Sequence, residues 1–390
     1  MIKNIFLHIG VHKTASTTIQ NTLYLERAKL SDNGILYPAF IAGDNLISNH
    51  SIPIYSLFCK EPEKYHINVN FGITNREAIQ ELHQEYQRQI EAQIADFIGE
   101  TLIISGEDIS LFDIDELRNL KVWLTKITHP EVNIRVVLMC RHPVSRFRSS
   151  LLAKVYNSIL QEKKVIERKL QQTHLYRNLI TVLSEVIGQE HITVVRYEDA
   201  ICHPFGPAGA LLALIDKYLP DKIKPVLLHE NPATNYETFV LLNAINRNCN
   251  HTSDYLPQLQ KKFEVMKLLL EMPGQKFMLS RDMSKKVWDT LSEDVNWLCS
   301  EFALQDYRFL DEDLKPNADI WSQQTLDWLK KNILHLPLNH RKTIILELWR
   351  TINKQNTLLS YTQRFRILKF ILSQAIKLYR SSELFKKSNT

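Results

Sequence analysis

The sequence predicts an α/β protein in which helices flank a parallel β-sheet and a helical extension follows at the C-terminus. Short apolar runs rich in β-branched residues alternate with longer amphipathic segments in the N-terminal part of the chain. These runs lack polar alternation, which is typical of strands covered on both faces of a sheet. The pattern of residues 205–312 predicts mostly helix.

The expected strands and helices alternate along the chain. Strands are predicted at Ile5–Ile9, Ile35–Tyr37, Leu102–Ser105, Ile134–Cys140 and Ile192–Arg196. Helices are predicted at Thr17–Leu30 and Asn75–Gly99, once or twice within Ser145–Ile180, and at Leu211–Tyr218, Tyr236–Asn246, Leu256–Glu271 and Ser284–Phe302. This alternation indicates βαβ units, whose parallel strands bind ligands at their carboxyl ends.

Composition is that of an ordinary globular protein. Of 390 residues, 44% are hydrophobic and 23% are charged, which excludes a wholly disordered or fibrous chain. The five cysteines are far apart and form no CxxC pair, so we expect reduced thiols rather than a zinc knuckle or a disulfide framework. Because neither an export signal nor a membrane-spanning apolar stretch is recognisable, we expect a cytoplasmic location.

The distribution of charged residues predicts two parts of the chain, a domain over 1–312 and a basic extension over 316–390. Residues 316–390 contain 13 Lys or Arg and 4 Asp or Glu, a balance of +9, whereas the other 315 residues have a balance of −4. Positive charge is therefore not spread over the whole chain, and nucleic acid is not expected as a partner.

The first chemical motif follows the strand Ile5–Ile9. His12 and Lys13 precede the hydroxyl tract Ser16-Thr17-Thr18, which opens the next predicted helix. The unpaired amides and the dipole at a helix N-terminus attract anions, and Lys13 adds a full positive charge. No second glycine follows, so this is not a Walker A loop. The alternative is a surface turn capped by Ser or Thr.

The second motif follows the strand Ile134–Cys140. Arg141 comes first, and a proline turn then leads into a helix that carries Arg146 and Ser149. Because Arg141 stands at the carboxyl end of a predicted central strand, it falls where open α/β sheets bind ligands. The alternative is an arginine cluster on a solvated helix face.

Together the two motifs resemble the sulfotransferases that use 3′-phosphoadenosine 5′-phosphosulfate, a family with a P-loop-like fold. His12–Thr18 is similar to the family's 5′-phosphosulfate loop, and the 3′-phosphate motif R-x-P-x-x-R-x-x-S is matched by Arg141, Pro143, Arg146 and Ser149. Val195–Asp199 resembles its Y-E-D segment, and Gly34–Pro38 and Asn231–Asn243 resemble bacterial carbohydrate-type members. The resemblance covers about residues 1–310.

The chain departs from the family pattern at two places. Ala15 and Ser16 stand where glycine and threonine are usual, so alanine would occupy a position that favours positive φ. The family's second cofactor loop is not clearly matched, since Met272–Phe277 fits it poorly.

The resemblance also implies roles for individual residues. The cofactor-binding residues would be His12, Lys13, Thr14, Ala15, Ser16, Thr17, Thr18, Arg141 and Ser149. Lys13 would be catalytic, stabilising charge on the bridging oxygen as the sulfuryl group leaves. Arg141 and Ser149 would hold the 3′-phosphate, a group that ATP lacks. This scheme needs no metal, and the sequence shows no ligand cluster for one.

An acceptor hydroxyl needs a general base, for which Glu107 is the best candidate. It follows the strand Leu102–Ser105, which places it on the same sheet edge as Lys13. The alternative is that Glu107 and Asp108 cap the next short helix. His12 and His50 are rivals as the base, and His50 lies in the long connection 39–74, which we expect to contribute to the acceptor site.

The sequence therefore predicts transfer of a sulfuryl group from 3′-phosphoadenosine 5′-phosphosulfate to a hydroxyl of a carbohydrate or glycolipid. One alternative is a nucleotide-dependent kinase, which the missing Walker A spacing disfavours. The other is a non-catalytic nucleotide-binding or membrane-scaffold protein.

Residues 361–381 predict a basic amphipathic helix. Its cationic face contains Arg366, Lys369, Ser373, Lys377 and Arg380, and its apolar face contains Phe365, Leu368, Ile371, Leu372, Ala375, Leu378 and Tyr379. Such a helix fits peripheral contact with the anionic inner face of a membrane. A helix docked on its own domain, or on a second copy in a homodimer, is the more common case.

Overall fold

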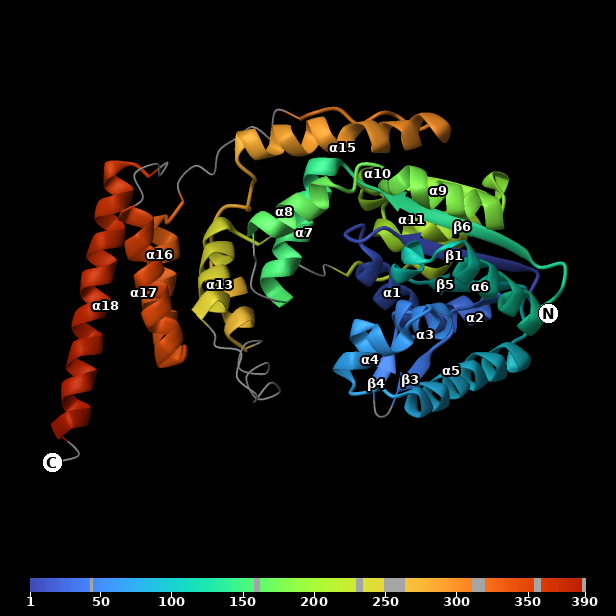
Figure 1. Cartoon of the computed structure of the whole chain (residues 1–390), viewed down its shortest axis with the longest axis horizontal. Coiled ribbons are helices and arrows are strands. Elements are labelled where there is room, and N and C mark those ends of the chain that lie inside the picture. Colours follow the sequence, from blue (N-terminus) through green and yellow to red (C-terminus); the bar gives the residue numbers. More distant parts are fainter. Residues whose placement is uncertain are drawn as a thin grey trace. The chain divides into compact units, whose positions relative to one another are not determined.

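The computed structural model describes residues 1–42, 45–157, 162–228, 234–248, 264–310, 320–353 and 359–387. The chain forms two compact units (Figure 1). The first contains Met1–Arg146, Gln172–Glu230 and Asp289–Arg308, and the second contains Phe147–Gln171, Asn231–Trp288 and Phe309–Thr390. The expected domain edge at 312–316 lies outside the described residues. The second unit includes more than the expected extension, because it also takes in segments from the middle of the chain.

A five-stranded parallel sheet forms the centre of the first unit. Its strands are β1 (Asn4–Gly10), β2 (Ile35–Leu36), β5 (Thr101–Ser105), β6 (Asn133–Cys140) and β7 (Ile192–Arg196). Their order is β2-β5-β1-β6-β7, and every neighbouring pair is parallel. The five strands predicted from the apolar runs, and the α/β fold class, are therefore confirmed.

Helices and short turns connect these strands. The helices of the first unit are α1 (Ser16–Leu25), α2 (Arg27–Asp32), α3 (Ser51–Phe58), α4 (His66–Asn70), α5 (Arg76–Asp96), α6 (Ile114–Ile127), α9 (Leu175–Val186), α10 (Tyr197–Ile201), α11 (Gly206–Ile215) and α12 (Leu219–Ile223). The 3₁₀ turns are η1 (Pro62–Lys64), η2 (Asp108–Leu111) and η3 (Gln189–His191), and β3 (Phe40–Ala42) pairs with β4 (Asn45–Ile47) as an antiparallel hairpin.

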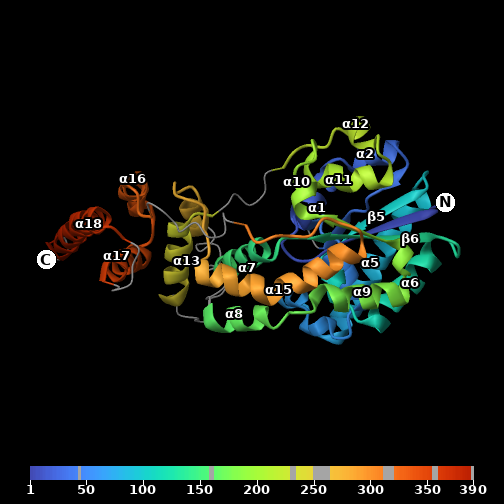
Figure 2. The same cartoon turned by 90° about the horizontal axis from the view of Figure 1, so that it is seen from above.

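Helices cover both faces of the sheet, as the absence of polar alternation predicts. On one face, Ile19 of α1 and Leu211 of α11 pack with Phe6 and Met139 of the strands in one buried cluster. Helices α6 and α9 lie on the other side of the sheet from α11 and α12 (Figure 2). This burial holds the carboxyl ends of β5, β1 and β6 side by side.

Some elements differ from the sequence prediction. The helix expected at Thr17–Leu30 is divided into α1 and α2 at Glu26. Helix α6 was not predicted, although its capping box is legible in the sequence: the Asp113 side chain accepts from the Glu116 amide, and the Glu116 side chain accepts from the Asp113 amide. The connection 39–74 contains the β3–β4 hairpin, α3 and α4 rather than an open loop.

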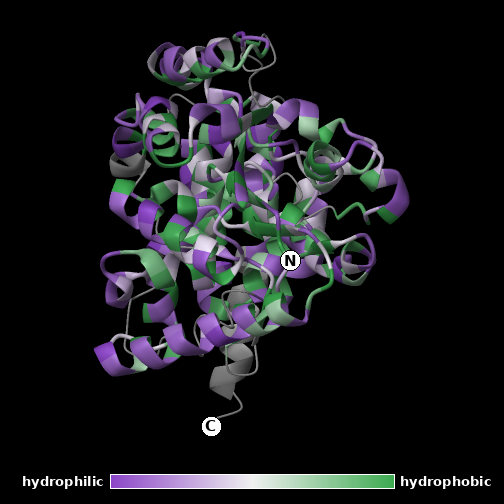
Figure 3. Ribbon diagram, turned by 90° about the vertical axis from the view of Figure 1, so that its right-hand side faces the viewer, coloured by the Kyte–Doolittle hydropathy of each residue, from purple (hydrophilic) through white to green (hydrophobic). Residues whose placement is uncertain are grey.

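The second unit is helical in the residues that the structure describes. Its elements include α8 (Glu162–Leu170), α13 (Tyr236–Asn248), α16 (Gln323–Asn332), η5 (Ile333–His335), α17 (Leu338–Asn353) and α18 (Tyr361–Lys387), while α7 (Pro143–Asn157) and α15 (Arg281–Glu301) contribute residues to both units. The helix expected at Leu256–Glu271 lies partly outside the described residues, as does the start of Asn231–Asn243. Hydrophobic and hydrophilic stretches alternate along many helices (Figure 3). Within the described part of the chain, no helix has the length and apolarity needed to cross a membrane.

Candidate functional site

The turn between β1 and α1 carries the first motif. β1 ends at Gly10 and α1 begins at Ser16, each within one residue of the predicted strand end at Ile9 and helix start at Thr17. Gly10 is needed because a Cβ atom at this position would lie 2.1 Å from the Ser16 Oγ. The Thr14 hydroxyl is buried and donates to the carbonyl oxygen of Val11 at 2.7 Å, so it shapes the loop from inside.

The N-terminus of α1 has the features of an anion site. No side chain caps it, and its first turn contains no acidic residue. Ser16 is buried, and its hydroxyl oxygen has no hydrogen-bond partner in the structure. Thr17 is exposed and Thr18 is half-buried. The alternative of a turn capped by its own Ser or Thr therefore finds no support, and an anion would supply the acceptors that these donors lack.

Two residues of the loop adopt left-handed backbone conformations. Lys13 has φ of 79°, and Ala15 has φ of 65°. Each such residue costs about 1–2 kcal/mol when it carries a Cβ atom. Ala15 is the position at which the sequence comparison with the family indicated a glycine. Strain of this size persists only where the surrounding structure enforces it, and it is common at binding sites.

Arg141, which directly follows β6, joins the second motif to this loop. Its Nη1 donates to the carbonyl oxygen of Lys13 at 2.6 Å, and its Nε donates to the Ser145 Oγ at 3.1 Å. The guanidinium carbon lies 4.1 Å from the ring centroid of Tyr197. These contacts fix the guanidinium beside the β1–α1 loop, so the start of the second motif lies against the first.

The Y-E-D segment supports this arrangement from β7 and α10. Tyr197 lies against the Arg141 guanidinium, and the Glu198 carboxylate accepts from the His142 amide at 3.1 Å. The hydroxyl of Tyr307 donates to the other Glu198 oxygen at 2.7 Å. The segment therefore positions the turn that carries Arg141. Tyr307 itself was not singled out by the sequence, because no motif surrounds it.

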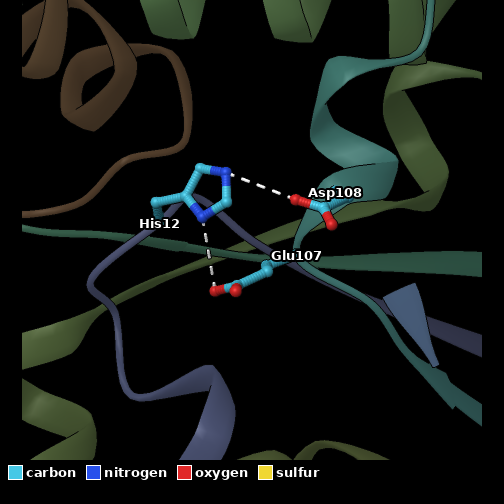
Figure 4. Close-up of side chains that lie close together, drawn as sticks. All are labelled: His12, Glu107 and Asp108. Carbon is cyan, nitrogen blue, oxygen red and sulfur yellow. Dashed lines mark ion pairs between the residues drawn. The ribbon is translucent and has the colours of Figure 1, made fainter. Parts of the chain in front are cut away.

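His12 lies between two carboxylates that follow β5 (Figure 4). Its Nδ1 is 3.5 Å from the Glu107 Oε2, and its Nε2 is 3.4 Å from the Asp108 Oδ1. Asp108 also accepts a hydrogen bond from the Tyr65 hydroxyl at 2.8 Å. The Glu107 side chain does not cap η2, so the alternative that it serves only as a helix cap finds no support.

The electrostatics of this cluster follow from burial and pairing. The hydrogen bond to Glu107 raises the pKa of His12 above its usual 6.5, although burial acts in the opposite direction. Burial also works against ionisation of Glu107, yet the hydrogen bond from His12 and the charges of His12, Lys13 and His8 leave its pKa below 4.5. Burial raises the pKa of Asp108. Lys13, His12 and Glu107 therefore interact electrostatically within one site.

His8 is a buried polar residue at the end of β1 that the sequence reasoning passed over. Its Nδ1 is 2.8 Å from the hydroxyl of Ser105, its register partner on β5, and its Nε2 is buried without a partner. Burial lowers the pKa of His8 to about 4, so the ring is neutral near pH 7. The sequence feature that could have identified His8 is a histidine inside an otherwise apolar strand.

His50 lies in the connection 39–74, as the sequence predicts, but its side chain is buried. Its ring is fully buried and stacks on Tyr37, its Nε2 donates to the Pro38 carbonyl at 2.7 Å, and its Nδ1 accepts from the Ser105 amide at 3.1 Å. Burial lowers its pKa to about 4. Both ring nitrogens are thus used to join the 39–74 connection to β5, so we do not retain His50 as an acceptor-binding residue or as the base.

Ser149 lies on α7 beyond the division between the two units, which falls after Arg146. Its predicted contact with a 3′-phosphate stays a prediction. The cofactor-binding roles of His12, Lys13, Thr14, Ala15, Ser16, Thr17, Thr18 and Arg141 also stay predictions, although the structure places these residues in one loop and against it.

The same cluster contains residues that could bind a metal ion, a feature that was not visible in the sequence. One ligand atom from each of His12, Glu107 and Asp108 lies within 4.8 Å of the others. These residue types suit divalent cations such as Zn²⁺ or Mn²⁺. The ring nitrogens of His12, however, each face a carboxylate, so both carboxylates already pair with this imidazole ring.

Two sulfotransferases are among the solved structures that are similar to this chain. No family model matches the chain, and no curated protein matches it either. A sulfotransferase from Alicyclobacillus acidocaldarius is 13% identical with a TM-score of 0.31, and covers 70% of this chain and 94% of its own. The sulfotransferase domain from the curacin biosynthetic pathway is 12% identical with a TM-score of 0.33, and covers 79% of this chain and 99% of its own.

Proposed function

We propose that the protein is a sulfotransferase that moves a sulfuryl group from 3′-phosphoadenosine 5′-phosphosulfate to a hydroxyl of an acceptor. The observation that carries this proposal is the contact between Arg141 and the backbone of Lys13. It brings a guanidinium, an ammonium-bearing loop and an uncapped helix N-terminus to one edge of the sheet. Such an edge is suited to a ligand that is anionic at both ends.

The loop would act on the 5′ side of the cosubstrate. The amides at the start of α1 and the hydroxyls of Ser16, Thr17 and Thr18 would bind the 5′-phosphate. Lys13 would stabilise the negative charge that develops on the bridging oxygen when the sulfur–oxygen bond breaks. Arg141 would bind the 3′-phosphate, for which a guanidinium is the best-matched donor.

Proton removal from the acceptor would use the pair formed by Glu107 and His12. Glu107 would accept the proton from the hydroxyl as its oxygen attacks sulfur, and the proton would then pass to His12, whose pKa is raised by the same carboxylate. Asp108 would hold the other side of the imidazole ring and stabilise its charged form. The proton starts on the acceptor and ends on His12, and the sulfuryl group replaces it.

The acceptor would be a carbohydrate or a glycolipid, and the reaction would take place in the cytoplasm. The support is the likeness of the sequence motifs to bacterial carbohydrate-type enzymes. The scheme requires no metal for the group transfer.

The deciding experiment is calorimetric titration of the full chain with adenosine 3′,5′-bisphosphate and, separately, with ATP. We expect binding of the bisphosphate and much weaker binding of ATP, because only the former offers a phosphate to Arg141. Arg118→Ala, a substitution of an exposed arginine on α6, is the matched control and should bind as the wild type does. Preference for ATP would instead favour a nucleotide-dependent kinase. Binding of the bisphosphate without turnover of any acceptor would favour a non-catalytic nucleotide-binding protein.

A further inference from the structure

Helix α18 has two apolar faces with different surroundings. Ile367, Phe370 and Ile371 are buried where the helix packs with α16 and α17. Tyr361, Phe365 and Leu372 are 87%, 59% and 56% exposed. Spacings of four and seven residues place these three on one side of the helix. The side chains from Ala375 onward lie outside the described residues. Helix α18 is therefore docked through one face and leaves a second apolar row at the surface.

Helix α17 carries a similar exposed row. Leu338, Leu346 and Trp349 are exposed large apolar side chains, and their spacing of eight and three residues also places them on one side of the helix. The acidic residue of this helix, Glu347, is buried and pairs with Arg247 and Arg350. Its charge is therefore both neutralised and withdrawn from the surface. We call the exposed apolar residues of the two helices the outer rows.

The sequence that carries the outer rows is rich in basic residues. Between Leu338 and Gln374 the sequence contains one acidic residue, Glu347, and the basic residues Arg341, Lys342, Arg350, Lys354, Arg364, Arg366 and Lys369. Lys369 is exposed and stands between Phe365 and Leu372 in the α18 row. In the described part of these two helices up to Gln374, no acidic side chain is exposed.

We propose that the outer rows of α17 and α18 bind the surface of an anionic phospholipid bilayer. Aromatic side chains such as Trp349 and Tyr361 favour the boundary between water and hydrocarbon. Lysine and arginine can lay their methylene chains on apolar surface while their charges remain among the headgroups. The attachment is peripheral, because no described helix can cross the membrane.

The charge pattern favours lipid over a second copy of the chain. Two copies joined through these helices would bring together extensions with a balance of +9 each, which repel one another. The centre of a protein interface is also depleted in lysine, whereas Lys369 lies inside the α18 row. A layer of anionic headgroups satisfies both features, because it accepts the apolar side chains and the cations together.

This inference stands apart from the proposed sulfuryl transfer, because it uses only residues of the second unit. The two can fail separately. If both hold, the membrane surface is where a glycolipid acceptor would be met.

The test is flotation of the full chain with vesicles of phosphatidylcholine, with or without phosphatidylglycerol. We expect the protein to float with the vesicles that contain phosphatidylglycerol, to stay in solution with phosphatidylcholine alone, and to dissociate as salt is raised. Lys342→Glu combined with Lys369→Glu should weaken binding by at least about 25-fold, since each cation contributes about fivefold. Phe365→Ser combined with Leu372→Ser should reduce the bound fraction severalfold at unchanged charge.

Matched controls use exposed residues of the first unit. Arg76→Glu with Lys126→Glu makes the same charge change, and Leu111→Ser with Val122→Ser makes the same apolar-to-polar change. Both controls should float as the wild type does. The proposal is overturned if the outer-row variants bind as well as the controls, or if the wild type fails to float with anionic vesicles at low salt. It is also overturned if sedimentation shows a dimer that Phe365→Ser with Leu372→Ser disrupts while flotation is unchanged.

Discussion

The guanidinium of Arg141 donates a hydrogen bond to the main-chain oxygen of Lys13, at 2.6 Å, although the two residues are 128 positions apart in the chain. The partner on Lys13 is a backbone oxygen in a left-handed turn, so the contact fixes the shape of the loop and does not involve the ammonium. Through this bond Arg141 supports the β1–α1 loop.

Lys13→Ala should abolish sulfuryl transfer while the fold is retained. Alanine bears the same Cβ atom at φ of 79°, so the strain of the loop does not increase, and the Lys13 carbonyl remains available to Arg141. Loss of a charge that stabilises the transition state lowers kcat by about 10²–10³-fold or more. The measurement is release of adenosine 3′,5′-bisphosphate, with the melting temperature as the control for folding. Activity within a few-fold of the wild type would contradict the role assigned to Lys13.

Arg141→Ala should weaken binding of adenosine 3′,5′-bisphosphate by about 10–100-fold, because hydrogen bonds to charged groups contribute about 1.5–3 kcal/mol. Arg141→Lys should recover only part of this affinity, since lysine keeps the charge but lacks the planar fork. Calorimetry measures both. An affinity equal to that of the wild type would remove Arg141 from the binding site.

Ser16→Ala should separate stability from binding. The Ser16 hydroxyl is buried and unpartnered, so its removal should leave the free energy of unfolding unchanged or raise it by about 1 kcal/mol. Binding of adenosine 3′,5′-bisphosphate should nevertheless weaken, because a donor to the 5′-phosphate is lost. Urea unfolding and calorimetry on the same sample give the two values. A variant that is less stable but binds normally would show that Ser16 serves the fold alone.

Ala15→Gly should stabilise the protein by about 0.5–1 kcal/mol, because glycine removes the cost of φ at 65° while adding some freedom to the unfolded chain. Gly34→Ala is the matched control, for which we expect the opposite change in stability. Gly34 has φ of 74° and open space around it, so alanine there adds only the backbone strain and should destabilise the chain by a similar amount. Denaturant unfolding checks both. If Ala15→Gly lowers stability, the strained loop conformation is wrong.

The pH dependence should report the ionisation of His12. Its pKa is raised above 6.5, and the ring must be neutral to receive the proton that Glu107 takes from the acceptor. In wild type, kcat/KM should therefore fall as pH decreases through a value above 6.5. His12→Asn should lower activity and move the fall in kcat/KM to below pH 6.5, because the ionisation of Glu107 alone then sets it. If kcat/KM of the wild type instead falls only below pH 4.5, Glu107 alone acts as the base.

The sheet and its first loop could be predicted from local sequence. Runs such as Ile134–Cys140 are apolar without alternation because both faces of β6 are buried, and that requirement is visible in any single strand. The hydroxyl tract at Ser16–Thr18 likewise falls in the first turn of α1, where the sequence places a helix start. The division of α1 from α2, the capping box of α6 and the hairpin within 39–74 were missed because apolar periodicity does not report caps or short paired strands.

What the sequence by itself determined is therefore the set of strands, their parallel arrangement, and the presence of cationic and hydroxyl side chains at two strand ends. Only the tertiary structure decided that His12 would meet Glu107 and Asp108, that Arg141 would bond to Lys13, and that His50 would be buried in support of β5. The physical reason is that these contacts depend on strand order: β1 lies between β5 and β6, so residues about a hundred positions apart end at one edge of the sheet. Local periodicity encodes which residues are buried, but it does not encode which of them become neighbours.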